Sequence, residues 1–203
     1  GDVYKRQVGK NALEVNTTGT GNVAVGANAL DANTTASNNI GIGSNSLGSN
    51  TTGDSNSSLG TFALQSSTTG DSNCAFGRSA LQNNTTASNN SAFGKDALKA
   101  NTTGDHNTVV GYNAGDANTT GRGHAVLGAN ALTANTTGDK CVAIGMSSLE
   151  SNTTGDDNVA VGDNSLNANT TASNNTAVGK SALAANTTGS NNVAVGSLAL
   201  DAS

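Results

Sequence analysis

The stretch from Gly26 to Ile42 reads GANALDANTTASNNIGI, and stretches of the same length and pattern follow one another along the chain. A glycine marks the period, because it stands at every seventeenth position without an insertion or deletion: Gly9, Gly26, Gly43, Gly60, Gly77, Gly94, Gly111, Gly128, Gly145, Gly162, Gly179 and Gly196. A fixed period over many copies is typical of a repeat array in which each unit stacks on its neighbours. We therefore expect one elongated domain whose functional surface is a row of identical groups.

The residues before each glycine form the clearest strand of the repeat, as in Asn22-Val23-Ala24-Val25. The large apolar row directly precedes the glycines: Val8, Val25, Ile42, Leu59, Phe76, Phe93, Val110, Leu127, Ile144, Val161, Val178 and Val195. The small-residue row stands one position earlier: Ala24, Gly41, Ser58, Ala75, Ala92, Val109, Val126, Ala143, Ala160, Ala177 and Ala194. Successive strand residues point to opposite faces. We expect the large row to face the interior and the uncharged small row to be covered by a symmetric partner chain; the alternative is a thin monomer whose small residues face inward.

A second apolar row, mostly leucine, follows four residues after the glycine, and Asn-Thr-Thr comes next in nearly every copy. If the chain stays extended there, the asparagine and the second threonine point outward and the first threonine points inward. The candidate interaction face is then Asn33, Thr35, Asn50, Thr52, Asn84, Thr86, Asn101, Thr103, Asn118, Thr120, Asn135, Thr137, Asn152, Thr154, Asn169, Thr171, Asn186 and Thr188.

Another asparagine row opens the strands, from Asn22 and Asn39 to Asn192, with His124 and Cys141 as exceptions. Stacked identical amides form hydrogen bonds to the coils above and below. A helical repeat fits poorly, because seventeen residues cannot hold two helices and a turn and Asn-Thr-Thr-Gly is a weak helix former. The chain also has no proline that would interrupt the hydrogen-bond ladders between coils. The sequence predicts an all-β parallel β-solenoid with one 17-residue repeat per coil and about 12 coils, roughly 58 Å long at about 4.8 Å per coil.

The segment Asn22–Leu30 (NVAVGANAL) resembles the YadA-like head repeats of trimeric autotransporter adhesins, which are built from an Asn-x-(Val/Ala)-(Ile/Val)-Gly-x-x-(Ala/Ser) motif. The same motif stands at Asn175–Ala182 and Asn192–Ala199, and the likeness extends from Val8 to the end. The resemblance implies a left-handed parallel β-roll, a homotrimer of laterally packed chains, and attachment to a host surface or glycan. The Asn-Thr-Thr-Gly arrays are also similar to parts of bacteriophage tail fibres. An extracellular place, on a bacterial surface or a phage particle, follows from either likeness.

Charge and hydropathy narrow the possible partners. The formal net charge is -5, and no basic stripe is present to neutralise phosphates, which argues against nucleic acid. No apolar run approaches the roughly 20 residues that cross a bilayer, so we expect no membrane insertion of this segment. The leader 1–7 (GDVYKRQ) matches no part of the repeat and is predicted to be non-native. The array 8–203 is predicted to be an uncapped piece of a longer fibre.

The sequence indicates no enzyme, cofactor or metal site. No acid or nucleophile recurs beside His106 and His124, so we interpret both as incidental substitutions. A calcium row or a structural turn could each explain Asp54, Asp71, Asp105, Asp139 and Asp156. One carboxylate per coil is too few for calcium, which takes six or more oxygens, so the turn is favoured.

Two further features have structural interpretations. Each Asn-Thr-Thr is formally an N-glycosylation acceptor, yet a hydrogen-bonded ladder explains the same residues. Cys74 and Cys141 lie four coils apart, about 19 Å, which is beyond the reach of a disulfide, and are predicted to be buried fillers.

A structural and adhesive rod is thus the first functional prediction, and the alternatives are ice binding and an array with no ligand of its own. Asn and Thr two residues apart on an extended strand would be separated by about 6.8 Å along the strand and about 4.8 Å between coils, a regular lattice able to order water. Adjacent threonines point to opposite faces, which leaves one outward threonine row rather than two.

Overall fold

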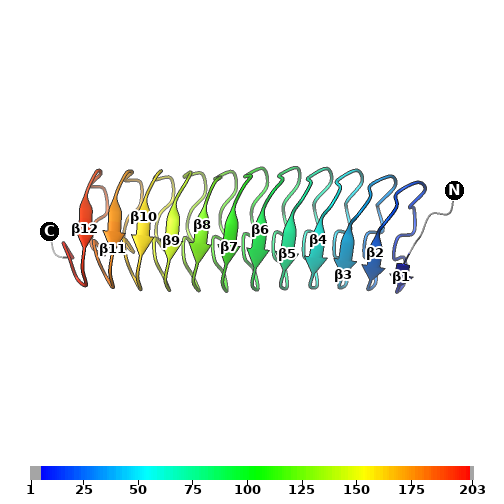
Figure 1. Ribbon diagram of the computed structural model, residues 1–203, viewed down its shortest axis with the longest axis horizontal. Coiled ribbons are helices and arrows are strands. Elements are labelled where there is room, and N and C mark those ends of the chain that lie inside the picture. The colour runs from blue at the N-terminus through cyan, green and yellow to red at the C-terminus, as the bar shows by residue number, and fades with distance from the viewer. Residues whose placement is uncertain (1–5, 202–203) are drawn as a thin grey trace.

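The computed structural model describes residues 6–201, which form a rod of stacked coils without a helix in that range (Figure 1). All strands are three residues long and lie parallel in one 12-stranded sheet in chain order. They are β1 (Arg6–Val8), β2 (Val23–Val25), β3 (Ile40–Ile42), β4 (Ser57–Leu59), β5 (Cys74–Phe76), β6 (Ser91–Phe93), β7 (Thr108–Val110), β8 (Ala125–Leu127), β9 (Val142–Ile144), β10 (Val159–Val161), β11 (Thr176–Val178) and β12 (Val193–Val195). The parallel β-solenoid with 17-residue coils is confirmed, with about 11 turns.

Each strand pairs with the next at a shift of one repeat, so that Ala24 lies beside Gly41 and Ala92 beside Val109. The first strand obeys the same register, because Arg6 pairs with Val23 and Gln7 with Ala24. Arg6 and Gln7, which the sequence analysis assigned to the leader, are therefore paired with the second strand and lie in the first coil. The remaining leader residues, 1–5, lie outside the described range.

The period-marking glycines allow the coils to touch through their backbones. Each has a φ between 127° and 152°, a region of backbone conformation that residues other than glycine rarely adopt. A Cβ atom on Gly94 would lie 2.3 Å from the carbonyl oxygen of Gly111 in the next coil. Stacking at this distance excludes any side chain, which explains why the glycine never changes.

The strand faces are the reverse of what we expected. The small-residue row is buried, whereas most members of the large apolar row are exposed, with Leu127 at 53% and Leu59 at 49%. The core is thin: each coil contributes the small residue of the strand and, in most coils, an adjacent pair such as Ala29 and Leu30. The Cγ of Leu30 would lie 3.2 Å from a Cβ placed on Gly41. Alanine, serine or glycine fills the inward position in most coils, valine does so only as Val109 and Val126, and a Leu or Phe there would overfill the space. Of the two alternatives, inward-facing small residues are the correct one, and no partner can pack on that row.

The leucines are fixed by a tight turn after the glycine. Leu30, Leu47 and the other buried leucines have φ near 50°, which is costly for a branched side chain. The backbone N–H of Leu30 donates to the carbonyl of Ser46 in the next coil at 3.0 Å. Complete burial of the side chain and this axial hydrogen bond offset the strain.

Candidate interaction surfaces

The asparagines of the Asn-Thr-Thr triplets, here called the inner asparagine row, point inward. Of the predicted interaction residues, Asn33, Asn50, Asn84, Asn101, Asn118, Asn135, Asn152 and Asn169 are fully buried, and Asn186, near the last coil, is half-buried. The prediction that they face outward is wrong because the chain does not stay extended. The N–H of Asn33 donates to the carbonyl of Leu30 at 3.2 Å, so a turn precedes the triplet and rotates the asparagine into the rod.

Inside the rod these amides form an axial ladder. Asn101 Nδ2 donates to Asn84 Oδ1 at 2.9 Å and to the carbonyl of Gly104 at 3.0 Å, and Asn101 Oδ1 accepts from Asn118 Nδ2 at 2.9 Å. One side chain thus joins three coils. The N-glycosylation acceptors are consequently structural ladder residues whose amide hydrogens are already engaged.

The two threonines of each triplet have different surroundings. The first is half-buried in most coils, and its hydroxyl donates to the next coil, as Thr85 Oγ1 does to the carbonyl of Thr102 at 3.0 Å. The second threonines form the outer threonine row, which is exposed in every coil as predicted: Thr18, Thr35, Thr52, Thr69, Thr86, Thr103, Thr120, Thr137, Thr154, Thr171 and Thr188. The nine predicted threonines therefore form one line on the surface, while the nine asparagines line up beneath it.

The asparagine row that opens the strands is a second ladder, as predicted. Asn22 Oδ1 accepts the backbone N–H of Asn39 at 2.9 Å, and Asn22 Nδ2 donates to the carbonyl of Ala36 at 2.7 Å. His124 replaces asparagine in this row and is buried, whereas His106 is exposed on the surface. The two histidines therefore occupy different environments.

A third ladder follows the turn carboxylates. The N–H of Asp54 donates to Asp71 Oδ1 at 2.7 Å, and the N–H of Asp71 donates to Ser88 Oγ at 2.9 Å. Aspartate and serine are interchangeable because each offers one oxygen to the coil before it. These side chains thus have a structural role between coils, and across residues 6–201 no three His, Cys, Asp or Glu side chains gather as metal ligands.

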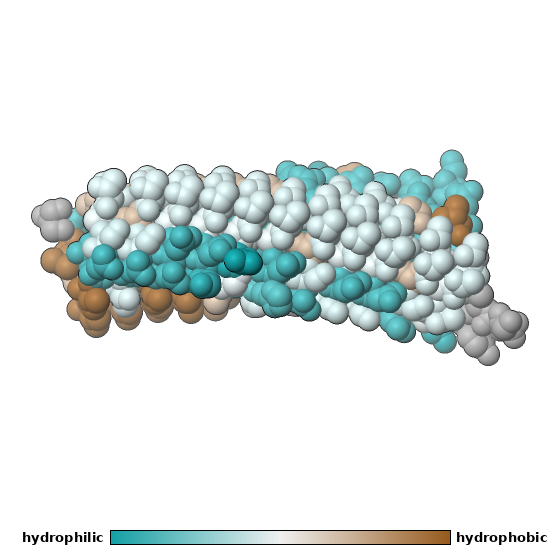
Figure 2. Space-filling view, turned by 90° about the horizontal axis from the view of Figure 1, so that it is seen from above, coloured by the Kyte–Doolittle hydropathy of each residue, from teal (hydrophilic) through white to brown (hydrophobic). Residues whose placement is uncertain are grey.

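The strand face is the surface that sequence reasoning missed. It combines the exposed large apolar row with the first residues of the strands: Arg6, Val23, Ile40, Ser57, Cys74, Ser91, Thr108, Ala125, Val142, Val159, Thr176 and Val193. Both sets point outward, because the residue between them points inward. Figure 2 shows apolar side chains gathered along one edge of the rod towards its C-terminal end. Apart from Arg6, this face has no charged residue. The sequence did contain a signal for an exposed apolar face: a Val-Ala-Val strand offers two large apolar residues on one face, while each coil has only a single leucine to pack against the strand.

Two details of the strand face correct or extend the sequence interpretation. Cys74 is half-buried here and is not a buried filler, while Cys141 is buried as predicted; both thiols are free. Phe76 and Phe93 pack edge to face with ring centroids 5.1 Å apart. Adjacent coils can thus form aromatic contacts on the outside of the sheet.

Comparison with protein-family models, with curated proteins and with solved structures found no match to this chain. A hollow at the first coil is lined by Gln7, Gly9, Asn11, Ala12, Leu13 and Glu14, and contains none of the predicted interaction residues. The surfaces that extend along the rod are therefore the basis for the functional argument.

Proposed function

We propose that this chain is a rigid, non-enzymatic structural rod of a bacterial surface adhesin or a phage tail fibre. The observation that carries the proposal is the continuity of axial bonding. Three side-chain ladders and the backbone hydrogen bonds of the sheet join successive coils. Bending the rod would break several of these bonds at once, so the geometry suits a spacer under mechanical load.

The adhesin or fibre assignment, and with it a place outside the cell, rests on the head-repeat motif. Its residues have clear roles in this structure: Asn22 bonds to the next coil, Ala24 fills the core, and Gly26 permits backbone contact. The motif is thus a set of stacking requirements and is compatible with the family's fold. A host-surface or glycan receptor is the partner that this assignment implies. No helix in residues 6–201 is both long and apolar enough to span a bilayer.

The partner of the strand face is proposed to be further copies of the chain. The face extends over all twelve strands and, after Arg6, has no charge, whereas soluble monomers rarely expose large contiguous apolar patches. Copies that turn this face towards a common axis would bury it symmetrically. The proposed number of three chains comes from the family resemblance. The proposed contact surface between these chains is the strand face, and it replaces the small-residue row that the sequence analysis expected.

Light scattering during size-exclusion chromatography tests this proposal. We expect a mass near three times the 19.8 kDa of the chain, and a monomer for the double variant Leu59→Lys/Leu127→Lys. The matched control, Thr69→Lys/Thr137→Lys, adds the same charge to the outer threonine row and should leave the trimer intact. A monomeric parent chain, or equal dissociation of both variants, would contradict self-association through the strand face.

Ice binding remains the second candidate, and the outer threonine row favours it. This row is exposed yet identical in all eleven coils, whereas the exposed residues that follow the glycines vary, as Arg78, Lys95 and Tyr112 show. Because the asparagines of the predicted lattice are buried, the outer threonines are the part of that lattice that remains exposed to water. Thermal hysteresis and ice shaping at micromolar protein, lost in Thr86→Lys/Thr120→Lys, would support ice binding. No ice shaping by the parent chain would eliminate it.

A further inference from the structure

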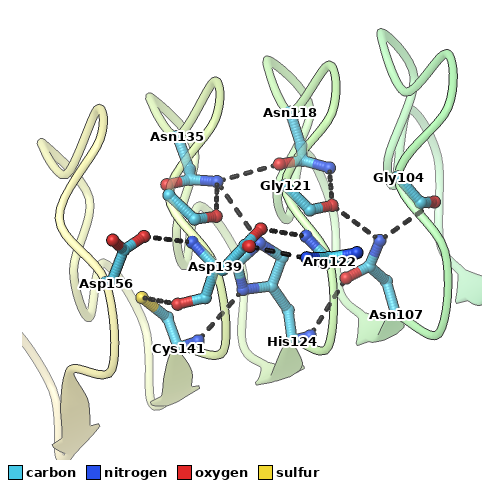
Figure 3. A network of polar contacts seen from close by, with 11 residues as sticks. Gly104, Asn107, Asn118, Gly121, Arg122, His124, Asn135, Asp139, Cys141 and Asp156 are labelled. Atoms are coloured by element: carbon cyan, nitrogen blue, oxygen red, sulfur yellow. Dashed lines mark hydrogen bonds and ion pairs between the residues drawn. The ribbon is translucent and has the colours of Figure 1, made fainter.

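The ladder of strand-opening asparagines changes chemistry at one place, where histidine and then cysteine replace asparagine in successive coils (Figure 3). The N–H of His124 donates to Asn107 Oδ1 at 3.0 Å, as in every regular coil. The N–H of Cys141, however, donates to the imidazole Nδ1 of His124 at 3.1 Å. A ring nitrogen thus replaces the amide oxygen as the acceptor, within a side chain that is only 2% exposed.

The surroundings determine which ring nitrogen carries the proton. Nδ1 must be unprotonated to accept the Cys141 N–H, so the neutral ring has its hydrogen on Nε2. Asn135 Nδ2 lies 3.3 Å from Nε2, but its two hydrogens are directed to Asn118 Oδ1 at 2.8 Å and to the carbonyl of Gly138 at 3.1 Å. Asn135 therefore does not require Nε2 as an acceptor.

We propose that His124 is a proton-sensitive joint in the rod: the neutral imidazole connects the coil of β8 to the coil of β9, and protonation at Nδ1 breaks that connection. A second N–H on the ring would directly face the N–H of Cys141. The buried amide would lose its acceptor, and two donors would be held in contact. Asparagine at the same position has no such state, because its amide oxygen keeps its acceptor role at any pH in this range.

The charged groups around the ring influence how readily it takes the proton. Burial lowers the pKa of His124 to about 4, against the opposing attraction of the Asp139 and Asp156 carboxylates. Asp139 is also paired with Arg122, at 3.3 Å between Oδ2 and Nε, which weakens its effect on the imidazole. Burial likewise raises the pKa of the Cys141 thiol to about 11, so that side chain stays uncharged.

The sign of the pH effect follows from these values. The pKa of His124 is near 6.5 when the coil is open and about 4 when it is closed, so the closed state binds fewer protons. The stabilisation is complete above pH 6.5 and is lost as the pH falls from about 6.5 to about 4. Acid therefore opens this joint before the regular coils.

Amide hydrogen exchange, read by NMR on the whole chain, tests the joint. Between pH 6.5 and 4 we expect the protection factor of the Cys141 amide to fall by about tenfold per pH unit, and by on the order of a hundredfold in total. The Asn175 amide, which donates to Asn158 Oδ1 at 3.0 Å, is the internal control and should not change. His124→Asn restores the regular ladder, and Cys141 should then behave like Asn175.

The proposal would be overturned if the Cys141 amide of His124→Asn lost as much protection in acid as the Cys141 amide of the parent chain. It would also be overturned if the Cys141 amide of the parent chain lost no protection. The ring nitrogens provide a second measurement that needs no variant. Their ¹⁵N shifts should show the hydrogen on Nε2 at pH 7, and a hydrogen on Nδ1 there would equally overturn it.

Discussion

The interior of the rod and its strand face are equally regular in sequence, but they differ in how strictly each position is kept. In the inner asparagine row Ser67 is the one departure from asparagine, whereas the large apolar row on the strand face contains valine, isoleucine, leucine and phenylalanine. The inner residues form directional hydrogen bonds to the neighbouring coils, and a different side chain cannot place the same atoms. The outer residues form no such directional bonds through their side chains, so several apolar side chains can occupy the same position. In the interior, identity between coils thus reports axial bonding, whereas on the surface the outer threonine row is identical and exposed; hydrophobicity alone does not report burial.

The largest effect should come from breaking the backbone contact between coils. In Gly94→Ala the new Cβ would lie 2.3 Å from the Gly111 carbonyl at a φ of 137°, so we expect about 4 kcal/mol of destabilisation in urea denaturation followed by circular dichroism. Gly48→Ala is the matched control, because its Cβ would have its nearest neighbour at 3.3 Å; it should change stability by less than about 0.5 kcal/mol. Similar losses in the two variants would show that the coils do not stack through the period glycine.

The next effect separates the interior from the surface within one triplet. Asn101→Ala leaves Asn84 Oδ1 and one hydrogen of Asn118 Nδ2 without partners, so we expect it to lower the free energy of unfolding by about 3 kcal/mol. Thr103→Ala, two residues away on the outer threonine row, should cost less than about 0.5 kcal/mol. The same urea experiment measures both, and a costly Thr103 variant would mean that the exposed row also supports the fold.

A gain of stability should follow from repairing the ladder. Ser67 interrupts the inner asparagine row, and Asn50 Oδ1 and Ser67 Oγ are consequently buried without a hydrogen-bond partner. Ser67→Asn supplies an amide that can donate to Asn50 and accept from Asn84, so we expect about 1–2 kcal/mol of stabilisation. The midpoint of urea unfolding should rise. An unchanged or lower midpoint would show that the ladder does not extend through this coil.

The smallest effect is expected in the turn ladder. Asp71→Ser keeps an oxygen in place to accept the N–H of Asp54, as Ser88 does for Asp71 itself, so stability should change by less than about 0.5 kcal/mol. Asp71→Ala removes the acceptor and should cost about 1 kcal/mol because the turn is exposed. Thermal melting of the two variants side by side would detect the difference. Equal melting temperatures would contradict the role of the oxygen.

Much of the candidate site was predictable from the sequence, and the two errors of the prediction have different origins. The asparagine ladder at Asn22 and Asn39 and the exposed row containing Thr103 followed from repetition and alternation. Asn101 was placed on the wrong side because alternation was continued through a turn that has no glycine or proline to announce it. The strand face was missed because the apolar character of Leu127 was read as burial.

The amino-acid sequence by itself determined the period, the parallel register and the stacking of like side chains, because a shift of seventeen residues superimposes every row on its own copies. Only the tertiary structure decided which row faces the core. Alternation requires that neighbouring strand residues lie on opposite faces, but it does not say which face is inside. The volume left between the strand and the leucine row decides which strand residue faces the core. In most coils this volume admits alanine and excludes valine or phenylalanine.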